Sequence, residues 1–321
     1  MRRLYHYAIV GLVTLLAGAL ALGAIACGDD DEDGNGEGPT ATSAAAEPTE
    51  EDTAVEPGTL PITTLEYRFE APPSISGGLT AVTLTNPGGE DHQGQLVLLN
   101  EGVTVDQLGA ALNSDPSGAA ALQLVTVAGG TNVVPAGGGT TEVIVDLDPG
   151  TYAMLCFVEN AEGTPHFALG MLSELEVTEP TEEADLPAPD HSVTATEYEF
   201  APPSAVAPGQ TTMQFINSGA EAHELGVVAL QEGFTADDLL ALFSAPEEPT
   251  AAPGEPTPTA AEEGPPPWTS VGGVGAIPPG GSAYWIQNLE AGTYALICFV
   301  PNAEGVPHAA LGMVASFTVE E

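Results

Sequence analysis

The chain has 321 residues, 43% of them hydrophobic, and it carries 46 acidic residues against only three basic ones. This charge excludes a nucleic-acid binder, because contact with phosphates requires a basic surface. The length is typical of two domains, and 38 Gly with 29 Pro favour turns and short strands over long helices.

The first 27 residues predict an export signal. Arg2 and Arg3 precede an uncharged stretch at 8–26, which ends in AIAC at Cys27 and is followed by GDDDEDG. This order resembles a bacterial lipoprotein signal, in which the cysteine is lipidated and becomes the new N-terminus. The resemblance implies a membrane partner through the lipid on Cys27, at the extracytoplasmic face of the cell membrane. An uncleaved anchor is the alternative, and it places the rest of the chain on the same side.

Residues 28–60 are acidic and rich in small residues and Pro, without apolar periodicity. Such a segment buries too little surface to offset the entropy of ordering it, so we predict a disordered acidic linker. The linker would hold the remainder of the chain away from the membrane.

The remainder of the chain contains one unit twice. EYRFEAPP at 66–73 recurs as EYEFAPP at 197–203, and 86–102 recurs at 217–233. The segments 150–171 and 292–313 are identical at 17 of 22 positions. We therefore predict a first domain at 61–178, a linker at 179–190, and a second domain at 191–321 with a Pro-rich loop insertion at 244–267.

Each copy is predicted to be mostly β. Short runs rich in Val, Leu, Thr and aromatic residues alternate with turn residues in the first copy, at 64–69, 80–86, 94–99, 141–147, 150–158 and 171–177. One short helix is expected after the third run, at 103–112 and again at 235–243. About seven strands and one helix per copy are typical of a Greek-key β-sandwich, so we predict an all-β fold of two tandem sandwiches.

Each copy also contains the same candidate metal ligands. They are His92, Cys156, His166 and Met171 in the first copy, and His223, Cys298, His308 and Met313 in the second. The spacing is C-x9-H-x4-M in both copies, with the other histidine far upstream. Two imidazoles, a thiolate and a weakly bound thioether are the ligand set of a blue-copper electron-transfer centre. Four of the six histidines and two of the three cysteines belong to these sets.

Both copies resemble the cupredoxin family, the plastocyanin-like blue copper proteins. The resemblance covers roughly 63–178 and 192–320, and lies in the H-x4-M ending before a closing β-run and in the GTY strand before the cysteine. It implies two cupredoxin-like sandwiches with one copper each, in an electron carrier rather than an enzyme, with a redox protein as partner. The Cys–His spacing is longer than in the family. The loop 158–166 either bulges outward and places His166 normally, or displaces it.

The residues leave other functions open. One alternative is a lipoprotein that stores or delivers copper, and another is a cupredoxin-like binding module that holds no metal. A disulfide between Cys156 and Cys298 is a third option, which export permits. A multicopper enzyme is disfavoured because the chain contains no H-x-H pair.

Overall fold

The computed structural model describes residues 55–114, 119–244 and 266–320, which all belong to one compact unit of the chain. The predicted export signal with Cys27, most of the predicted linker 28–60 and most of the Pro-rich loop 244–267 lie outside the described residues. Within the described ranges, none of the helices combines the length and apolar character needed to cross a bilayer.

The first copy contains strands in every predicted run and two further strands, one of them only three residues long, that the pattern did not predict. Its strands are β1 (Gly58–Leu65), β2 (Arg68–Glu70), β3 (Ser74–Ser76), β4 (Gly78–Asn86), β5 (His92–Leu99), β6 (Val125–Val134), β7 (Gly139–Leu147), β8 (Gly150–Leu155) and β9 (Leu172–Thr178). The sequence analysis missed β6 because Gly129 and Gly130 interrupt its apolar run. Both of these glycines have positive φ.

The predicted helices are confirmed in both copies. They are α1 (Val105–Ser114) in the first and α4 (Ala236–Ser244) in the second, while the short α2 (Ala119–Leu122) and α3 (His166–Leu169) were not predicted. A capping box begins α4, because the peptide N–H of Asp238 donates to Thr235 Oγ1 and that of Thr235 donates to Asp238 Oδ2.

The second copy repeats the strand order of the first apart from a strand equivalent to β3. Its elements are β10 (His191–Thr196), β11 (Glu199–Ala201), β12 (Gly209–Asn217), β13 (His223–Leu230), β14 (Trp268–Ile277), β15 (Ser282–Leu289), β16 (Gly292–Ile297), the 3-10 helix η2 (His308–Leu311) and β17 (Val314–Val319). Residues 179–190, which were predicted to be a linker, contain no helix or strand.

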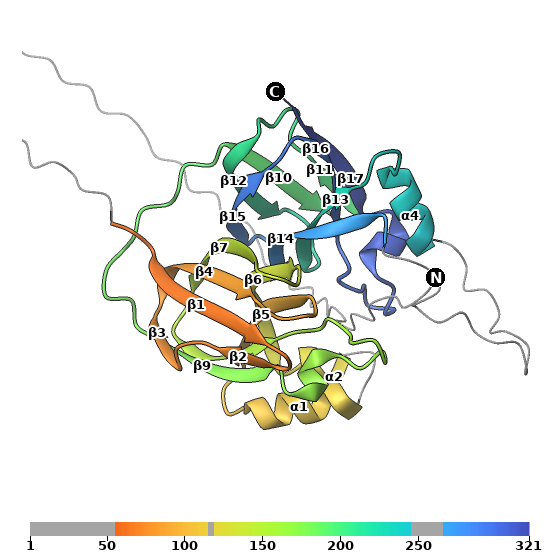
Figure 1. Ribbon diagram of the computed structural model, residues 1–321. Coiled ribbons are helices and arrows are strands. Elements are labelled where there is room, and N and C mark those ends of the chain that lie inside the picture. Colours follow the sequence, from red (N-terminus) through yellow and green to blue (C-terminus); the bar gives the residue numbers. More distant parts are fainter. Residues whose placement is uncertain (1–54, 115–118, 245–265, 321) are drawn as a thin grey trace, which may run out of the picture. The chain divides into compact units, whose positions relative to one another are not determined.

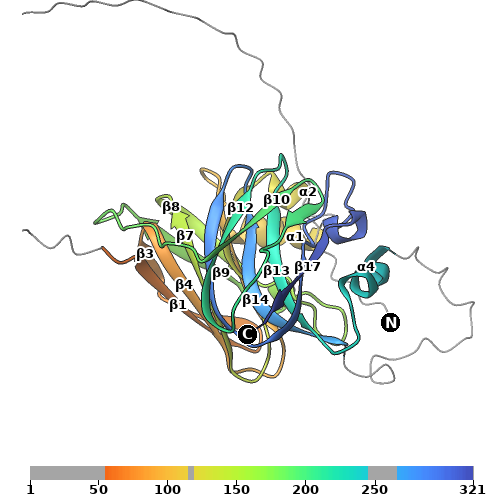
Figure 2. The same cartoon turned by 90° about the horizontal axis from the view of Figure 1, so that it is seen from above.

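Among the described residues the strands form two sheets, and both sheets run through both copies (Figures 1 and 2). One has the order β11-β10-β12-β15-β7-β4-β1-β2, and the other β17-β16-β13-β14-β6-β5-β8-β9-β3. The copies meet where β15 pairs with β7 and β14 pairs with β6. This architecture confirms the predicted fold class, two tandem cupredoxin-like β-sandwiches.

The burial pattern explains why these residues form these strands. In β4, Val82 and Leu84 are buried while the residues between them are partly exposed, as expected for a strand that faces the core on one side. In contrast, β5 is buried almost throughout, since it lies between β6 and β8. Trp285 of β15 is fully buried, and its Nε1 donates to Thr141 Oγ1 of the first copy at 2.7 Å. This contact ties the two copies together at their junction.

Candidate metal centres

The upstream histidine and the cysteine of each copy lie at the ends of neighbouring strands. His92 is the first residue of β5 and Cys156 directly follows β8, and these two strands pair antiparallel. The peptide N–H of Gln93 donates to Cys156 Sγ at 3.4 Å. His223 and Cys298 occupy the same places on β13 and β16. Strand pairing therefore brings together two residues that are far apart in the sequence.

The long loop between Cys156 and His166 is closed at its base by backbone hydrogen bonds. The N–H of His166 donates to the carbonyl of Val158 at 2.8 Å, and that of Phe167 donates to the carbonyl of Cys156 at 2.9 Å. Asn160 Oδ1 organises the protruding turn by accepting two backbone N–H groups. The extra residues therefore bulge outward, and His166 stays beside Cys156.

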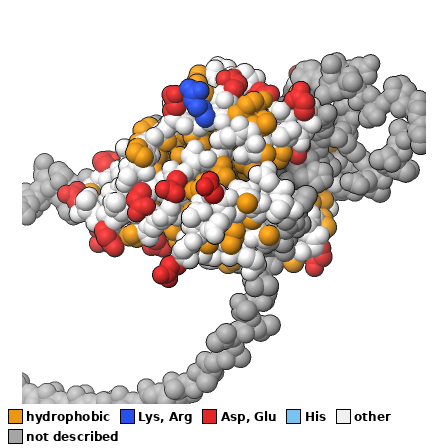
Figure 3. Space-filling view, turned by 90° about the horizontal axis from the view of Figure 1, so that it is seen from below, with side chains coloured by type: hydrophobic (Ala, Val, Ile, Leu, Met, Phe, Trp, Pro, Cys, Tyr) orange, Lys and Arg blue, Asp and Glu red, His pale blue; other side chains and the backbone are white. Residues whose placement is uncertain are grey.

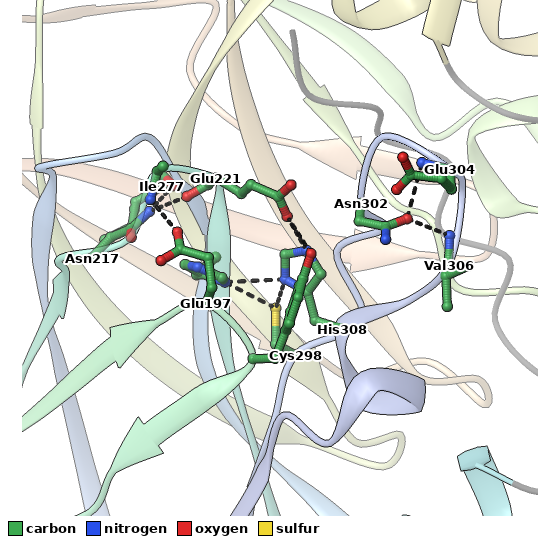
Figure 4. A network of polar contacts seen from close by, with 12 residues as sticks. Glu197, Asn217, Glu221, Ile277, Cys298, Asn302, Glu304, Val306 and His308 are labelled. Carbon is green, nitrogen blue, oxygen red and sulfur yellow. Dashed lines mark hydrogen bonds and ion pairs between the residues drawn. The ribbon is translucent and has the colours of Figure 1, made fainter. Parts of the chain in front are cut away.

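The loop of the second copy is built in the same way. The N–H of His308 donates to the carbonyl of Val300 at 2.9 Å, and Asn302 organises the turn (Figure 4). Of the two arrangements that the sequence left open, the outward bulge is the one that both copies adopt.

Three donor atoms converge in each copy. In the first, the Nδ1 atoms of His92 and His166 are 3.1 Å apart, and Cys156 Sγ lies 3.9 Å and 3.5 Å from them. The second copy repeats these separations at 3.1, 3.9 and 3.5 Å between the equivalent atoms. All six side chains are fully buried. Among the described residues, these two trios are the groups of His, Cys, Asp or Glu able to hold a metal ion.

The trios fit a copper ion. Metal–nitrogen bonds of about 2.0–2.1 Å and metal–sulfur bonds of about 2.3 Å, the values known for zinc, place donor atoms on one ion roughly 3–4 Å apart. The separations in both copies fall in this range. Two imidazoles and one thiol suit copper better than hard cations such as Mg²⁺ or Ca²⁺, which prefer oxygen.

Both candidate axial methionines lie against their trio. Met171 is fully buried in one apolar cluster with Cys156 and Val158. Its N–H donates to the carbonyl of His166 at 2.9 Å, and its carbonyl accepts the N–H of Cys156 at 3.2 Å. Met313 makes the same two backbone contacts with His308 and Cys298. The backbone thus holds each methionine beside the cysteine, and coordination by its sulfur stays a prediction.

A glutamate that the sequence analysis did not single out lies against the far nitrogen of the loop histidine. Glu221 Oε2 is 2.9 Å from His308 Nε2, and Glu90 Oε2 is 3.2 Å from His166 Nε2 without hydrogen-bond alignment. An imidazole that donates from Nε2 keeps Nδ1 free for a metal. The repeated E-x-H spacing at 90–92 and 221–223 was the pattern that could have revealed these residues.

A tyrosine contacts the same imidazole in each copy. The ring of Tyr67 meets His166 edge-on at 5.1 Å between centroids, and Tyr198 meets His308 at 4.9 Å. Both tyrosines have φ of 62°, which is uncommon for a residue other than glycine. The predicted strand at 64–69 is therefore wrong at its centre, because a turn at Tyr67 separates β1 from β2.

Gly170 allows this turn to approach the ligand loop. A Cβ on Gly170 would lie 2.8 Å from the carbonyl oxygen of Tyr67, and the φ of Gly170 is 129°. A larger residue would therefore push the loop away from the tyrosine.

Burial sets the protonation state of the metal-free trio. Loss of solvation lowers the pKa of His92, His223 and His308 to about 4, and it also lowers the pKa of His166. Burial raises the pKa of Cys156 to about 12 and that of Cys298 well above its usual value. The metal-free centre at neutral pH therefore holds two neutral imidazoles and a thiol, and the contact of His308 with Glu221 is a hydrogen bond from a neutral ring.

Cys156 and Cys298 are both free thiols, each buried inside its own trio. The disulfide between them that was considered from the sequence is therefore wrong. Each thiol remains available to a metal.

No protein-family model matches the chain, and no curated protein is significantly similar to it. Among solved structures, an auracyanin from Roseiflexus castenholzii is 23% identical over 37% of this chain and 96% of its own, with a TM-score of 0.26. Auracyanin A, a "blue" copper protein from Chloroflexus aurantiacus, is 23% identical over 38% of this chain and 100% of its own, with a TM-score of 0.26. The copper-containing nitrite reductase from Thermus scotoductus is 15% identical over 82% of this chain and 61% of its own, with a TM-score of 0.24.

The class of protein follows from the topology and from the donor atoms. The chain contains two cupredoxin-like β-sandwiches in tandem, and each holds a buried His-Cys-His trio with a methionine packed beside it.

Proposed function

We propose that this protein carries electrons through two mononuclear copper centres, one in each copy. The observation that carries the proposal is that the same three donor atoms converge at the same separations in both copies, inside the protein and on equivalent elements. In each copy the separations suit donor atoms bound to one metal ion, and the donor types suit copper.

The chain's own residues perform three tasks at each centre. In the second copy, His223, Cys298 and His308 would hold copper, with Met313 as a weak axial ligand. The ends of β13 and β16 and the backbone hydrogen bonds of the loop keep these ligands in place, and full burial excludes water. The Glu221 carboxylate holds the ring of His308 so that Nδ1 faces Cys298. When bound, copper supplies one-electron redox chemistry.

We further propose that the protein acts at the extracytoplasmic face of the membrane, tethered by a lipid on Cys27. The order of charged, apolar and lipobox residues supports this location, and the acidic segment 28–60 would act as a spacer. A Cys27→Ser variant should then appear in the soluble fraction, whereas the natural chain should remain with membranes. Equal partition of both proteins would contradict the tether.

A redox protein with a basic surface is the partner that we propose. Acidic side chains are spread over the face seen in Figure 3, and the whole chain has 46 acidic residues and three basic ones. Such a charge favours encounters with a cationic partner, and it makes their rate depend on salt. We propose electron carriage rather than catalysis. Among the described residues the candidate metal groups are the two trios, each suited to a single copper ion, and the sequence has no H-x-H pair of the kind that multicopper enzymes carry.

Copper loading of the purified protein tests the function. We expect two copper ions per chain and an intense visible thiolate-to-copper band, which disappears with ascorbate and returns on reoxidation. Copper uptake without this band would instead favour storage or delivery of the metal. No uptake at stoichiometric copper would favour a binding module that holds no metal.

A further inference from the structure

The two centres differ at the residue that follows the upstream histidine. This residue is Gln93 in the first copy and Glu224 in the second. Both side chains are buried, at 1% and 2% exposure. The second centre therefore has an ionisable carboxyl group where the first has a neutral amide.

Both oxygens of Glu224 accept hydrogen bonds. Oε1 accepts the N–H of Phe299, the residue directly after Cys298, at 2.7 Å. Oε2 accepts from Nδ2 of Asn132, which lies on β6 of the first copy, at 3.0 Å. Hydrogen bonds donated to both oxygens favour the charged carboxylate over the neutral acid. Its negative charge thus lies against the backbone of Phe299, the residue that directly follows the candidate copper ligand Cys298.

The other acidic groups near the trios match in the two copies except at Asp91, which precedes His92 and has Ala222 as its equivalent. Glu66 and Glu90 of the first copy have Glu197 and Glu221 as their equivalents in the second. Their charges therefore largely cancel when the two centres are compared. Asp91 is partly exposed, so water screens its charge more than that of the buried Glu224. Gln93 and Glu224 occupy equivalent buried positions directly after the upstream histidine. Their exchange gives the second centre a buried ionisable group that the first centre lacks.

We propose that Glu224 makes the two centres unequal, so that the second copy holds copper at a lower reduction potential than the first. This inference rests on the proposed function. A buried negative charge stabilises Cu(II) more than Cu(I), because the oxidised ion carries more positive charge and the surroundings screen weakly. Glu224 is a positioning and charge-bearing residue here, since it would act through its charge and through its hydrogen bond with Phe299, not as a ligand.

The test measures the potential of each centre separately, in one buffer at pH 8. Cys298→Ser retains the first trio alone and Cys156→Ser retains the second alone. We expect the midpoint potential of the second centre to lie below that of the first. In the Cys156→Ser protein, Glu224→Gln should raise the midpoint potential of the second centre by at least about 59 mV. For one electron this is a tenfold change in the Cu(II)/Cu(I) ratio.

Gln93→Glu in the Cys298→Ser protein is the reciprocal variant, and it should lower the potential of the first centre. It also carries the test if Glu224→Gln does not fold, as judged by circular dichroism. Glu304→Gln removes an exposed acidic group from the loop of the second copy and should leave the potential unchanged.

Three outcomes would overturn the inference. They are equal potentials in the two single-centre proteins, a second centre with the higher potential, and folded Glu and Gln variants that do not differ. A thiolate-to-copper band with equal potentials would refute the inequality and leave the proposed function standing. Absence of the band from both single-centre proteins would refute the proposed function together with the inference.

Discussion

The Nε2 atom of His308 lies 2.9 Å from Oε2 of Glu221, while its Nδ1 atom lies 3.5 Å from Cys298 Sγ (Figure 4). The carboxylate thus fixes the ring from outside, and the opposite nitrogen faces the thiol. Tyr198 donates from its hydroxyl group to the same carboxylate oxygen at 3.5 Å. Glu221 therefore joins the ligand and the tyrosine that packs on it.

Removing this carboxylate should weaken copper binding. We expect Glu221→Ala to reduce the copper affinity of the second centre by about 10–100-fold, as is usual for residues that orient a ligand histidine. Competition with a copper chelator measures the change. Glu90→Ala in the first copy should cost less, because Glu90 lies 3.2 Å from its histidine without hydrogen-bond alignment. Equal affinities in natural and Glu221→Ala proteins would show that the contact has no orienting role.

The backbone at Tyr198 gives a second prediction. Its φ of 62° favours glycine, so Tyr198→Gly should be more stable than Tyr198→Ala by about 1 kcal/mol. Urea unfolding of the metal-free protein measures the difference. Tyr284, within the strand β15, is the matched control. There the alanine variant should be the more stable of the two, because glycine weakens a strand. The same order at both positions would argue against strain at Tyr198.

The metal-free protein should lose stability as the pH falls from about 6.5 to 4. His92, His223 and His308 have a pKa of about 4 when folded and about 6.5 when unfolded, so the unfolded chain binds more protons in this window. Each histidine changes the free energy of unfolding by up to about 1.4 kcal/mol per pH unit. Burial raises the pKa of Glu224 to about 7, so at this one group the folded chain binds more protons than the unfolded chain. This single carboxyl group therefore offsets only part of the effect of the three histidines.

Urea unfolding of the metal-free protein at several pH values checks this slope. His223→Gln removes one of the shifted imidazoles and should make the slope shallower. A stability that stays constant between pH 6.5 and 4 would mean that these histidines are not neutral in the folded protein.

Copper uptake at pH 7 should release about one proton per ion. The imidazoles are already neutral, whereas burial raises the pKa of Cys156 to about 12, so the thiol must lose its proton to bind the metal. Calorimetric titration in buffers of different ionisation enthalpy counts the protons. Release of none would mean that the cysteines do not bind as thiolates, and release of three would mean that the imidazoles were charged.

Loss of one cysteine should remove about half of the visible absorption. Cys298→Ser leaves the trio of the first copy intact, and Cys156→Ser leaves that of the second. The double variant should have no thiolate-to-copper band. Retention of the full band in either single variant would show that only the other copy binds copper through its cysteine.

The sequence by itself determined the chemistry and the duplication. The four candidate ligands of each centre, their order and their repetition could be read directly, because ligand identity is a property of single side chains. The alternating apolar runs also determined the fold class. The strand β6 escaped detection because Gly129 and Gly130 break its pattern, and the turn at Tyr67 escaped because tyrosine ordinarily favours a strand.

Only the tertiary structure decided whether the ligands meet. His92 and Cys156 are 64 positions apart and converge because β5 pairs with β8. The hydrogen bond from His166 to Val158 decided that the long loop bulges instead of displacing its histidine. The acidic partner of each loop histidine and the buried charge of Glu224 also emerged only there. These features depend on contacts between distant segments and on exclusion of water, which local residue patterns do not contain.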